Sequence, residues 1–123
     1  MNIYDINLRN SRAIIKWCSI NLGMSKYRKY SKLKISITRS IPFRGLYVER
    51  GEESIIFINP QNHRSFNEFI DTVIHEYTHF LHGLEYYDQI LDITGYDKHP
   101  MEQSSNIVAD LLKTKCRKDI FSW

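Results

Sequence analysis

The apolar residues that follow Ser65 recur at steps of three and four, and this period constrains the fold more than any other feature. The positions are Phe66, Phe69, Ile70, Val73, Tyr77, Phe80, Leu81 and Leu84. This spacing places them along one side of an α-helix, which must bury that side against the rest of the molecule. Ser65 and Glu68 form a Ser-x-x-Glu capping box. The sequence therefore predicts an amphipathic helix that begins at about residue 66.

The other flank of this helix carries two histidines, in the stretch HEYTH at 75–79. Residues four apart lie on the same face of a helix, so His75 and His79 can direct two imidazoles at one point. Glu76 lies beside that point, whereas Tyr77 faces away from it and is expected in the core. Two histidine ligands with an adjacent general base are the HExxH arrangement of zinc peptidases.

The remaining segments predict an α+β fold. With 123 residues, of which 42% are apolar, the chain is expected to form one domain over residues 1–123. Periodicity predicts a helix over 9–22, strands over 33–38, 45–49 and 54–59, and a final helix that starts near Pro100. Residues 85–99 have weak periodicity and are predicted to be a loop. The expected buried face of the final helix is Ile107, Val108, Leu111 and Leu112.

Composition excludes some classes of protein. No stretch approaches the ~20 apolar residues of a membrane span, and the N-terminus lacks the pattern of a signal sequence. Cys18 and Cys116 are too few for a disulfide scaffold. They predict two reduced thiols, with a bridge between the terminal helices as the alternative. We therefore expect a cytoplasmic protein without a membrane partner.

The net charge of +3 is unevenly distributed. Residues 6–48, which we call the basic segment, contain ten lysines and arginines and no acidic residue. Residues 49–123 contain seven basic and thirteen acidic residues. Such asymmetry can mark a binding surface for nucleic acid or another polyanion. The favoured interpretation is a solvated basic face, with nucleic acid as a less favoured partner.

A catalytic zinc ion needs a third protein ligand. His82 lies about 10 Å along the helix axis from His75, so the third ligand must come from another element. Glu102, in the first turn of the final predicted helix, is the best placed candidate. Asn106 and Asp110 follow it at one-turn intervals and are candidates to orient a ligating histidine through its second ring nitrogen.

These two segments together resemble a known family. HEYTH, followed by HPMEQSSN with its glutamate 23 residues after His79, resembles the small gluzincin metallopeptidases, of the minigluzincin and ImmA/IrrE types. The second motif of that family looks like His-Pro-x-Glu-x-Glu-Ala-Asn on a helix that supplies a glutamate ligand. The matching residues here are His99, Pro100, Glu102 and Asn106, whereas Ser104 and Ser105 replace the second glutamate and the alanine.

The resemblance implies a zincin-like fold, in which the C-terminal helix supplies the third zinc ligand. It also implies a cytoplasmic zinc endopeptidase that cuts a protein or peptide, and a phage or another mobile element as the setting. Zn²⁺ would be held by His75, His79 and Glu102, with Glu76 as the general base towards the attacking water. Peptide substrates of zincins bind along an edge strand, here expected at Gly45 and Tyr47. The candidate oxyanion donors are Tyr86, Tyr87, Tyr96 and His99.

Two alternatives remain at this point. One is an SprT-like, DNA-associated protease, which uses a histidine as third ligand some fifteen to twenty residues after HExxH. His99, which lies 20 residues after His79, would take that role, and the basic segment would suit DNA. The other alternative is a catalytically inactive binding module with the zincin fold.

Overall fold

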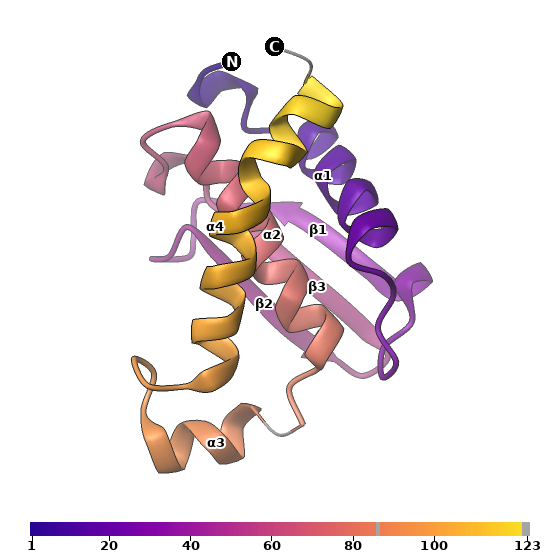
Figure 1. The fold of residues 1–123 in the computed structure, drawn as a ribbon, viewed down its shortest axis with the longest axis vertical. Helices are drawn as coiled ribbons and strands as arrows, with labels where there is room; N and C mark the ends of the chain where they lie inside the picture. Colours follow the sequence, from indigo (N-terminus) through magenta and orange to yellow (C-terminus); the bar gives the residue numbers. More distant parts are fainter. Residues whose placement is uncertain (86, 122–123) are drawn as a thin grey trace.

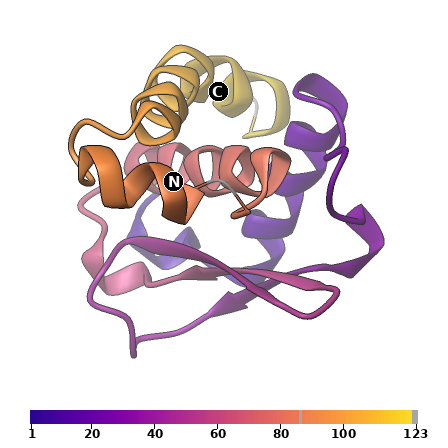
Figure 2. The ribbon, with the colours of Figure 1, turned by 90° about the horizontal axis from the view of Figure 1, so that it is seen from below.

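A three-stranded sheet forms one layer of the protein, and the helices gather on one face of it (Figures 1 and 2). The structure, a computed structural model, describes residues 1–85 and 87–121. Within these residues the α-helices are α1 (Leu8–Asn21), α2 (Phe66–His82), α3 (Tyr87–Thr94) and α4 (Pro100–Phe121). The strands are β1 (Leu33–Ile37), β2 (Gly45–Arg50) and β3 (Glu53–Ile58). Short 3-10 helices cover Ile3–Asp5, Tyr30–Lys32 and Pro60–Asn62. This arrangement confirms the predicted α+β class.

The strand β3 lies in the centre of the sheet, parallel to β1 and antiparallel to β2. Its alternate side chains Ser54, Ile56 and Ile58 are buried against the helical layer. A central strand pairs with a neighbour on each side, and here one of its faces is covered by helices. This environment suits the nearly continuous apolar run of its sequence. The prediction that this segment is better buried than residues 45–49 is confirmed. The less buried strands β1 and β2 form the two edges of the sheet.

The helix α2 fills the centre of the molecule, as its period predicts. The hydroxyl of Ser65 accepts the N–H of Glu68 at 3.2 Å and caps the first turn. The apolar side of α2 is buried from Phe66 to Phe80. Tyr77 lies fully in this core, where its hydroxyl donates to the carbonyl of Gly23 at 2.7 Å. The opposite flank of α2 is therefore the one that remains for His75 and His79.

Two predictions about the C-terminal third need correction. Residues 85–99 were expected to be a loop, but residues 87–94 form α3, a short helix without a buried side chain. The predicted buried face of α4 is also partly wrong, because Ile107 and Leu111 are 60% and 72% exposed. The side chains of α4 that are buried are mostly small: Ser105, Ala109 and Cys116. Small residues allow α4 to approach α2 closely, which a search for large apolar residues misses.

The two cysteines are buried free thiols, as predicted, and do not form the alternative bridge between the terminal helices. Burial raises the pKa of Cys18 well above its usual value and that of Cys116 to about 12. None of the described helices is both long enough and apolar enough to cross a membrane.

Gly45 allows β2 to pass closely over α2. A Cβ atom at this position would lie 2.6 Å from Cγ2 of Thr72 and 3.1 Å from Cγ of Glu76. We predict that Gly45→Ala lowers the free energy of unfolding by about 1–3 kcal/mol, because the strand or the helix must shift. Urea denaturation of the metal-free protein measures this loss.

Thr72→Ser provides the matched control, because it removes Cγ2 but keeps the hydroxyl that bonds to His63 at 2.9 Å. If the contact with Cγ2 causes the loss, the Gly45→Ala/Thr72→Ser double variant will lose less free energy of unfolding than the two single variants lose together. Strict additivity of the two losses would contradict the steric explanation.

Candidate metal centre

His75 and His79 lie one turn apart on α2 and face the same point. Their Nε2 atoms are 3.1 Å apart, and their rings meet edge to face with centroids 4.9 Å apart. Glu76, between them in the sequence, is 8% exposed. One potential ligand atom from each of these three residues lies within 4.8 Å of the other two. The helix thus brings together the His-Glu-His group that the sequence predicts.

Glu102 reaches the same point from the first turn of α4. Its Oε1 atom lies 3.0 Å from Nε2 of His75 and 2.5 Å from Nε2 of His79. The second oxygen, Oε2, accepts a hydrogen bond from the hydroxyl of Tyr87 at 3.0 Å. Both carboxylate oxygens are therefore held, and Glu102 is buried.

A buried hydrogen bond fixes α4 against α2 beside these residues. The hydroxyl of Thr78, on α2, bonds to the hydroxyl of Ser105, on α4. Thr78 also lies 2.6 Å from the carbonyl oxygen of His75, which it can donate to. Ser105 follows Glu102 by three residues, so it lies about one turn further along α4. This bond therefore fixes where Glu102 lies along the α4 axis relative to the two histidines. The alanine expected at position 105 by family resemblance could not make it.

The three donor atoms suit a metal ion. Two imidazole nitrogens and one carboxylate oxygen lie at the corners of a triangle with sides of 3.1, 3.0 and 2.5 Å. Ligand atoms of tetrahedral zinc, at ~2.0–2.1 Å from the ion, are about 3.3 Å from one another. The donor types, two histidines and one glutamate, are those of a catalytic zinc site. The donor types of His75, His79 and Glu102 therefore fit Zn²⁺, and two of the three separations are close to those of a tetrahedral site, whereas the 2.5 Å between Glu102 and His79 would have to widen around the ion.

The two carboxylates of the site ionise differently. Burial raises the pKa of Glu76 above its usual value, and the two histidines and the backbone N–H of Tyr47 offset only part of this rise. Burial would also raise the pKa of Glu102, but hydrogen bonds from His75 and His79 lower it well below the usual value. The pKa of His75, which burial lowers, is raised overall by Glu102 and Glu76. Glu102 is thus suited to remain an anion, and Glu76 to take up a proton.

His99 lies beside the site with both ring nitrogens already bonded to the backbone. Its Nδ1 atom accepts the N–H of Met101 at 3.1 Å, so Nε2 carries the proton and donates to the carbonyl of Tyr87 at 2.8 Å. The ring stacks on that of Tyr87, with centroids 4.0 Å apart. His99 is fully buried and holds Tyr87 in place. The geometry brings Glu102, and not His99, to the two histidines.

The other predicted site residues are spread around this centre. Tyr96 is 61% exposed and lines the clefts on both sides of Glu76; burial and the charge of Glu102 raise its pKa to about 12. Asn106 lines the cleft beside His75. The carboxylate of Asp110 is exposed and pairs with Lys113 at 3.0 Å instead of reaching a histidine. Tyr86 lies outside the described residues.

Two adjoining clefts flank Glu76 along β2. The larger, of about 420 Å³, is mainly apolar, and Leu84 and Tyr87 form part of its wall. The smaller, of about 230 Å³, is polar and contains His75, Asp71 and Asn106. Gly45 and Glu76 line both clefts. An extended chain laid along β2 would therefore pass directly over Glu76.

The outer edge of β2 faces these clefts with main-chain groups that do not bond to β3. The N–H of Asn59 donates to the carbonyl of Arg44 at 3.0 Å, which makes 44 and 59 a hydrogen-bonded pair of the antiparallel ladder. Such pairs alternate, so residues 46, 48 and 50 also bond to β3. The main-chain groups of Gly45, Tyr47 and Glu49 consequently face away from β3. Gly45 and Tyr47 are the edge positions that the sequence predicts.

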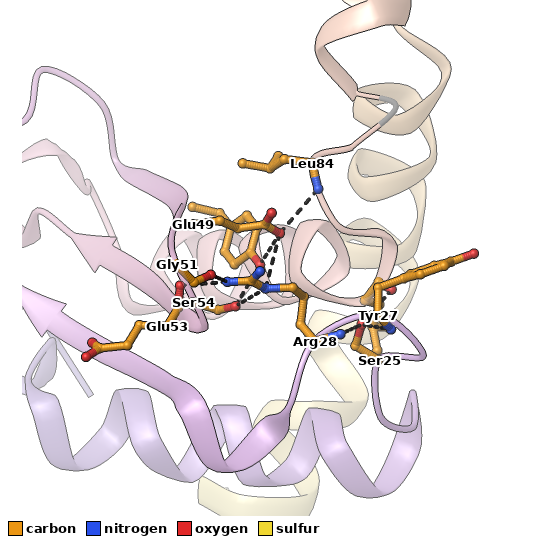
Figure 3. Close-up of polar contacts among 10 residues, drawn as sticks. Ser25, Tyr27, Arg28, Glu49, Gly51, Glu53, Ser54 and Leu84 are labelled. Atoms are coloured by element: carbon orange, nitrogen blue, oxygen red, sulfur yellow. Dashed lines mark hydrogen bonds and ion pairs between the residues drawn. The ribbon is translucent and has the colours of Figure 1, made fainter.

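A network of polar contacts holds the wall of the larger cleft (Figure 3). Glu49 accepts the N–H of Leu84 at 3.2 Å and the hydroxyl of Tyr47 at 2.7 Å. Arg28, from the basic segment, donates to the carbonyls of Gly51 and Glu53, at 2.8 Å each, and lies 3.7 Å from the Glu49 carboxylate. Sequence reasoning does not find this network, because its members are distant in the chain. The absence of acids from residues 6–48 is the one signal that Arg28 must find its partner elsewhere.

Tyr87 should support the ligand role of Glu102. We predict that Tyr87→Phe weakens zinc binding by about tenfold, because Oε2 of Glu102 loses its donor while the stacking on His99 is kept. A competition titration against a chelator of known affinity measures the change. Tyr27→Phe, at an exposed tyrosine away from the site, is the matched control. Equal affinity of the Tyr87 variant and the parent would mean that the two helices alone hold Glu102.

The chain was compared with protein-family models, with curated proteins and with solved structures, and none of these comparisons finds a match.

Proposed function

We propose that the protein is a zinc-dependent metallopeptidase of zincin-like fold. The observation that carries this proposal is the convergence of His75 and His79 of α2 and Glu102 of α4 on one point beside Glu76, 23 to 27 residues apart in the chain. A site for metal storage or structure has no need of a buried, basic carboxylate next to its ligands. A hydrolytic site needs one.

His75, His79 and Glu102 would hold the ion. A bound Zn²⁺ supplies a Lewis acid and lowers the pKa of a water molecule to about 7. Glu76, whose pKa burial raises, takes a proton from the attacking water and passes it to the leaving amine. Tyr87 and His99 keep Glu102 directed at the two histidines.

The outer edge of β2 supports a peptide as substrate. The main-chain groups of Gly45 and the carbonyl of Tyr47, whose N–H bonds to Glu76, can pair with an extended peptide, which adds a strand to the sheet. The two clefts then receive its side chains on either side of Glu76, an apolar one towards Leu84 and a polar one towards Asp71 and Asn106. Tyr96 lines both clefts, and in this proposal it donates to the carbonyl oxygen as charge develops there.

Cleavage of an unfolded protein tests the proposal. We expect zinc-loaded protein to cut β-casein, with the new termini identified by mass spectrometry. We also expect 1,10-phenanthroline to stop the cleavage and added Zn²⁺ to restore it. A protein that binds one zinc ion tightly but cuts neither β-casein nor a library of short peptides would instead be a binding module.

A further inference from the structure

The second edge of the sheet, at β1, also has free main-chain groups. The N–H of Thr38 donates to the carbonyl of Ile58 at 2.9 Å, which continues the parallel ladder between β1 and β3. Main-chain groups alternate in direction along a strand, so residues 34 and 36 face β3 and residues 33, 35 and 37 face outward. Among residues 1–85 and 87–121, no hydrogen bond reaches the N–H or the carbonyl of Ile35. The middle of this edge is open.

A groove of about 580 Å³ lies between this edge and α1. Arg12 and Lys16 line it from α1, one turn apart, and Lys34 lines it from β1. Its other walls are apolar: Ile15, Leu33 and Ile35, with the side of Tyr30. The groove thus joins an open strand edge to apolar walls and three cations.

The positive charge of this groove is largely unbalanced. Lys34 pairs with Glu53 at 2.9 Å across two exposed side chains. Arg12 and Lys16 have no acidic partner among the described residues. By contrast, Arg28 and Arg44 of the same basic segment both lie within 4.0 Å of a glutamate. The groove is therefore a part of the basic segment in which the charge is available to a partner.

We propose that the groove between α1 and β1 binds an extended acidic peptide, which adds a strand to the open edge of β1. Its main chain pairs with Ile35, its apolar side chains contact Ile15 and Leu33, and its carboxylates meet Arg12, Lys16 and Lys34. The open backbone edge and the apolar walls favour a peptide over a nucleic acid. Tyr30, the aromatic residue that lines the groove, is half-buried and packs against the core, so less of its ring is available for stacking on a base.

This peptide site is separate from the metal centre. The strands β1 and β2 form opposite edges of the sheet, with β3 between them. A partner at β1 therefore leaves the edge at Gly45 and Tyr47 free. The inference does not depend on the proposed peptidase activity, and either can fail alone.

Fluorescence anisotropy with labelled decapeptides tests the proposal on the full chain. The probe alternates glutamate with valine. A second peptide alternates glutamate with proline, which keeps the charge but removes alternate N–H donors and the strand conformation. A third alternates lysine with valine, and a single-stranded decathymidylate represents nucleic acid. We expect saturable binding of the first probe, at least tenfold weaker binding of the second, and none of the third.

Charge reversal locates the site. Arg12→Glu/Lys16→Glu should weaken binding of the glutamate–valine peptide by at least about tenfold, because two attractive contacts become repulsive. Lys26→Glu/Arg39→Glu makes the same change in net charge at exposed residues outside the groove, and should change affinity less than about threefold. Equal thermal melting curves of the two variants exclude unfolding as the cause.

Four results would overturn the proposal. They are no binding of the glutamate–valine peptide, equal binding of the glutamate–proline peptide, equal losses in the two charge-reversal variants, and tighter binding of the decathymidylate than of the peptide. The last result would assign the groove to nucleic acid.

Discussion

Glu76→Gln should abolish peptide-bond cleavage while zinc remains bound. Glutamine has the same shape as glutamate but cannot take a proton from water, and a general base typically contributes 10²–10⁴-fold to the rate. We expect kcat to fall by at least about a thousandfold. Glu76 lies beside the two histidines, but Glu102, not Glu76, bonds to both Nε2 atoms. The zinc content should therefore stay at one ion per chain.

Two measurements separate catalysis from binding in this variant. Metal analysis and a chelator titration report zinc, and mass spectrometry of the digested β-casein reports the rate. Glu52→Gln, at an exposed glutamate outside the site, is the control for the loss of a negative charge. Cleavage by Glu76→Gln at the parental rate would show that another group is the base. Loss of zinc from this variant would show that Glu76 is a ligand.

The helix of the site could be predicted because its signals are local. The capping pair Ser65 and Glu68 and the apolar period of residues 66–84 depend only on neighbours within a few turns. The spacing of His75 and His79 then fixes their relative direction. Glu102 was a candidate because Pro100 predicts a helix start, and helical position is also a local property.

The rest of the site depends on contacts that no local pattern encodes. Tyr87 holds Glu102 from α3, an eight-residue helix without a buried side chain that was predicted to be a loop. The close crossing of α2 and α4 depends on the pair Thr78 and Ser105, whose small polar side chains resemble surface residues in the sequence. Sequence reasoning named the candidate ligands, but it did not predict that Tyr87 and Ser105 hold Glu102 and its helix in place.

The two edges of the sheet differ for a physical reason. At β2, Gly45 lacks the Cβ atom that would push the strand away from Thr72 and Glu76, so this edge lies against the metal centre. At β1, the strand and α1 leave a groove between them, which Leu33 and Ile35 line from the strand. The sequence predicts both strands, but only the three-dimensional arrangement shows that both edges are open.

Replacing Glu102 should weaken zinc binding as strongly as replacing either histidine. Glu102 is an anion held 2.5 Å from His79 and 3.0 Å from His75, and its pKa lies below the usual value because of these bonds. The neutral amide of Glu102→Gln does not offset the positive charge of the zinc ion, and an amide is a poor zinc ligand. Changes in residues that only orient a ligand cost ~10–100-fold in affinity. We therefore expect Glu102→Gln to cost at least about 100-fold.

Ser104 provides the sharpest contrast with Glu102. It occupies the position at which the small gluzincins, which this sequence resembles, have their second glutamate. Ser104 is exposed on α4, whereas Glu102 is buried. A hydroxyl is also a poor zinc ligand, so Ser104→Ala should change the affinity less than about threefold. Competition against a chelator, with His79→Ala as the reference for a lost ligand, ranks the variants. If Glu102→Gln binds zinc as tightly as the parent and His99→Ala does not, His99 is the third ligand. If neither change weakens binding, the ion has only two protein ligands on this chain, and the proposed hydrolysis loses its structural basis.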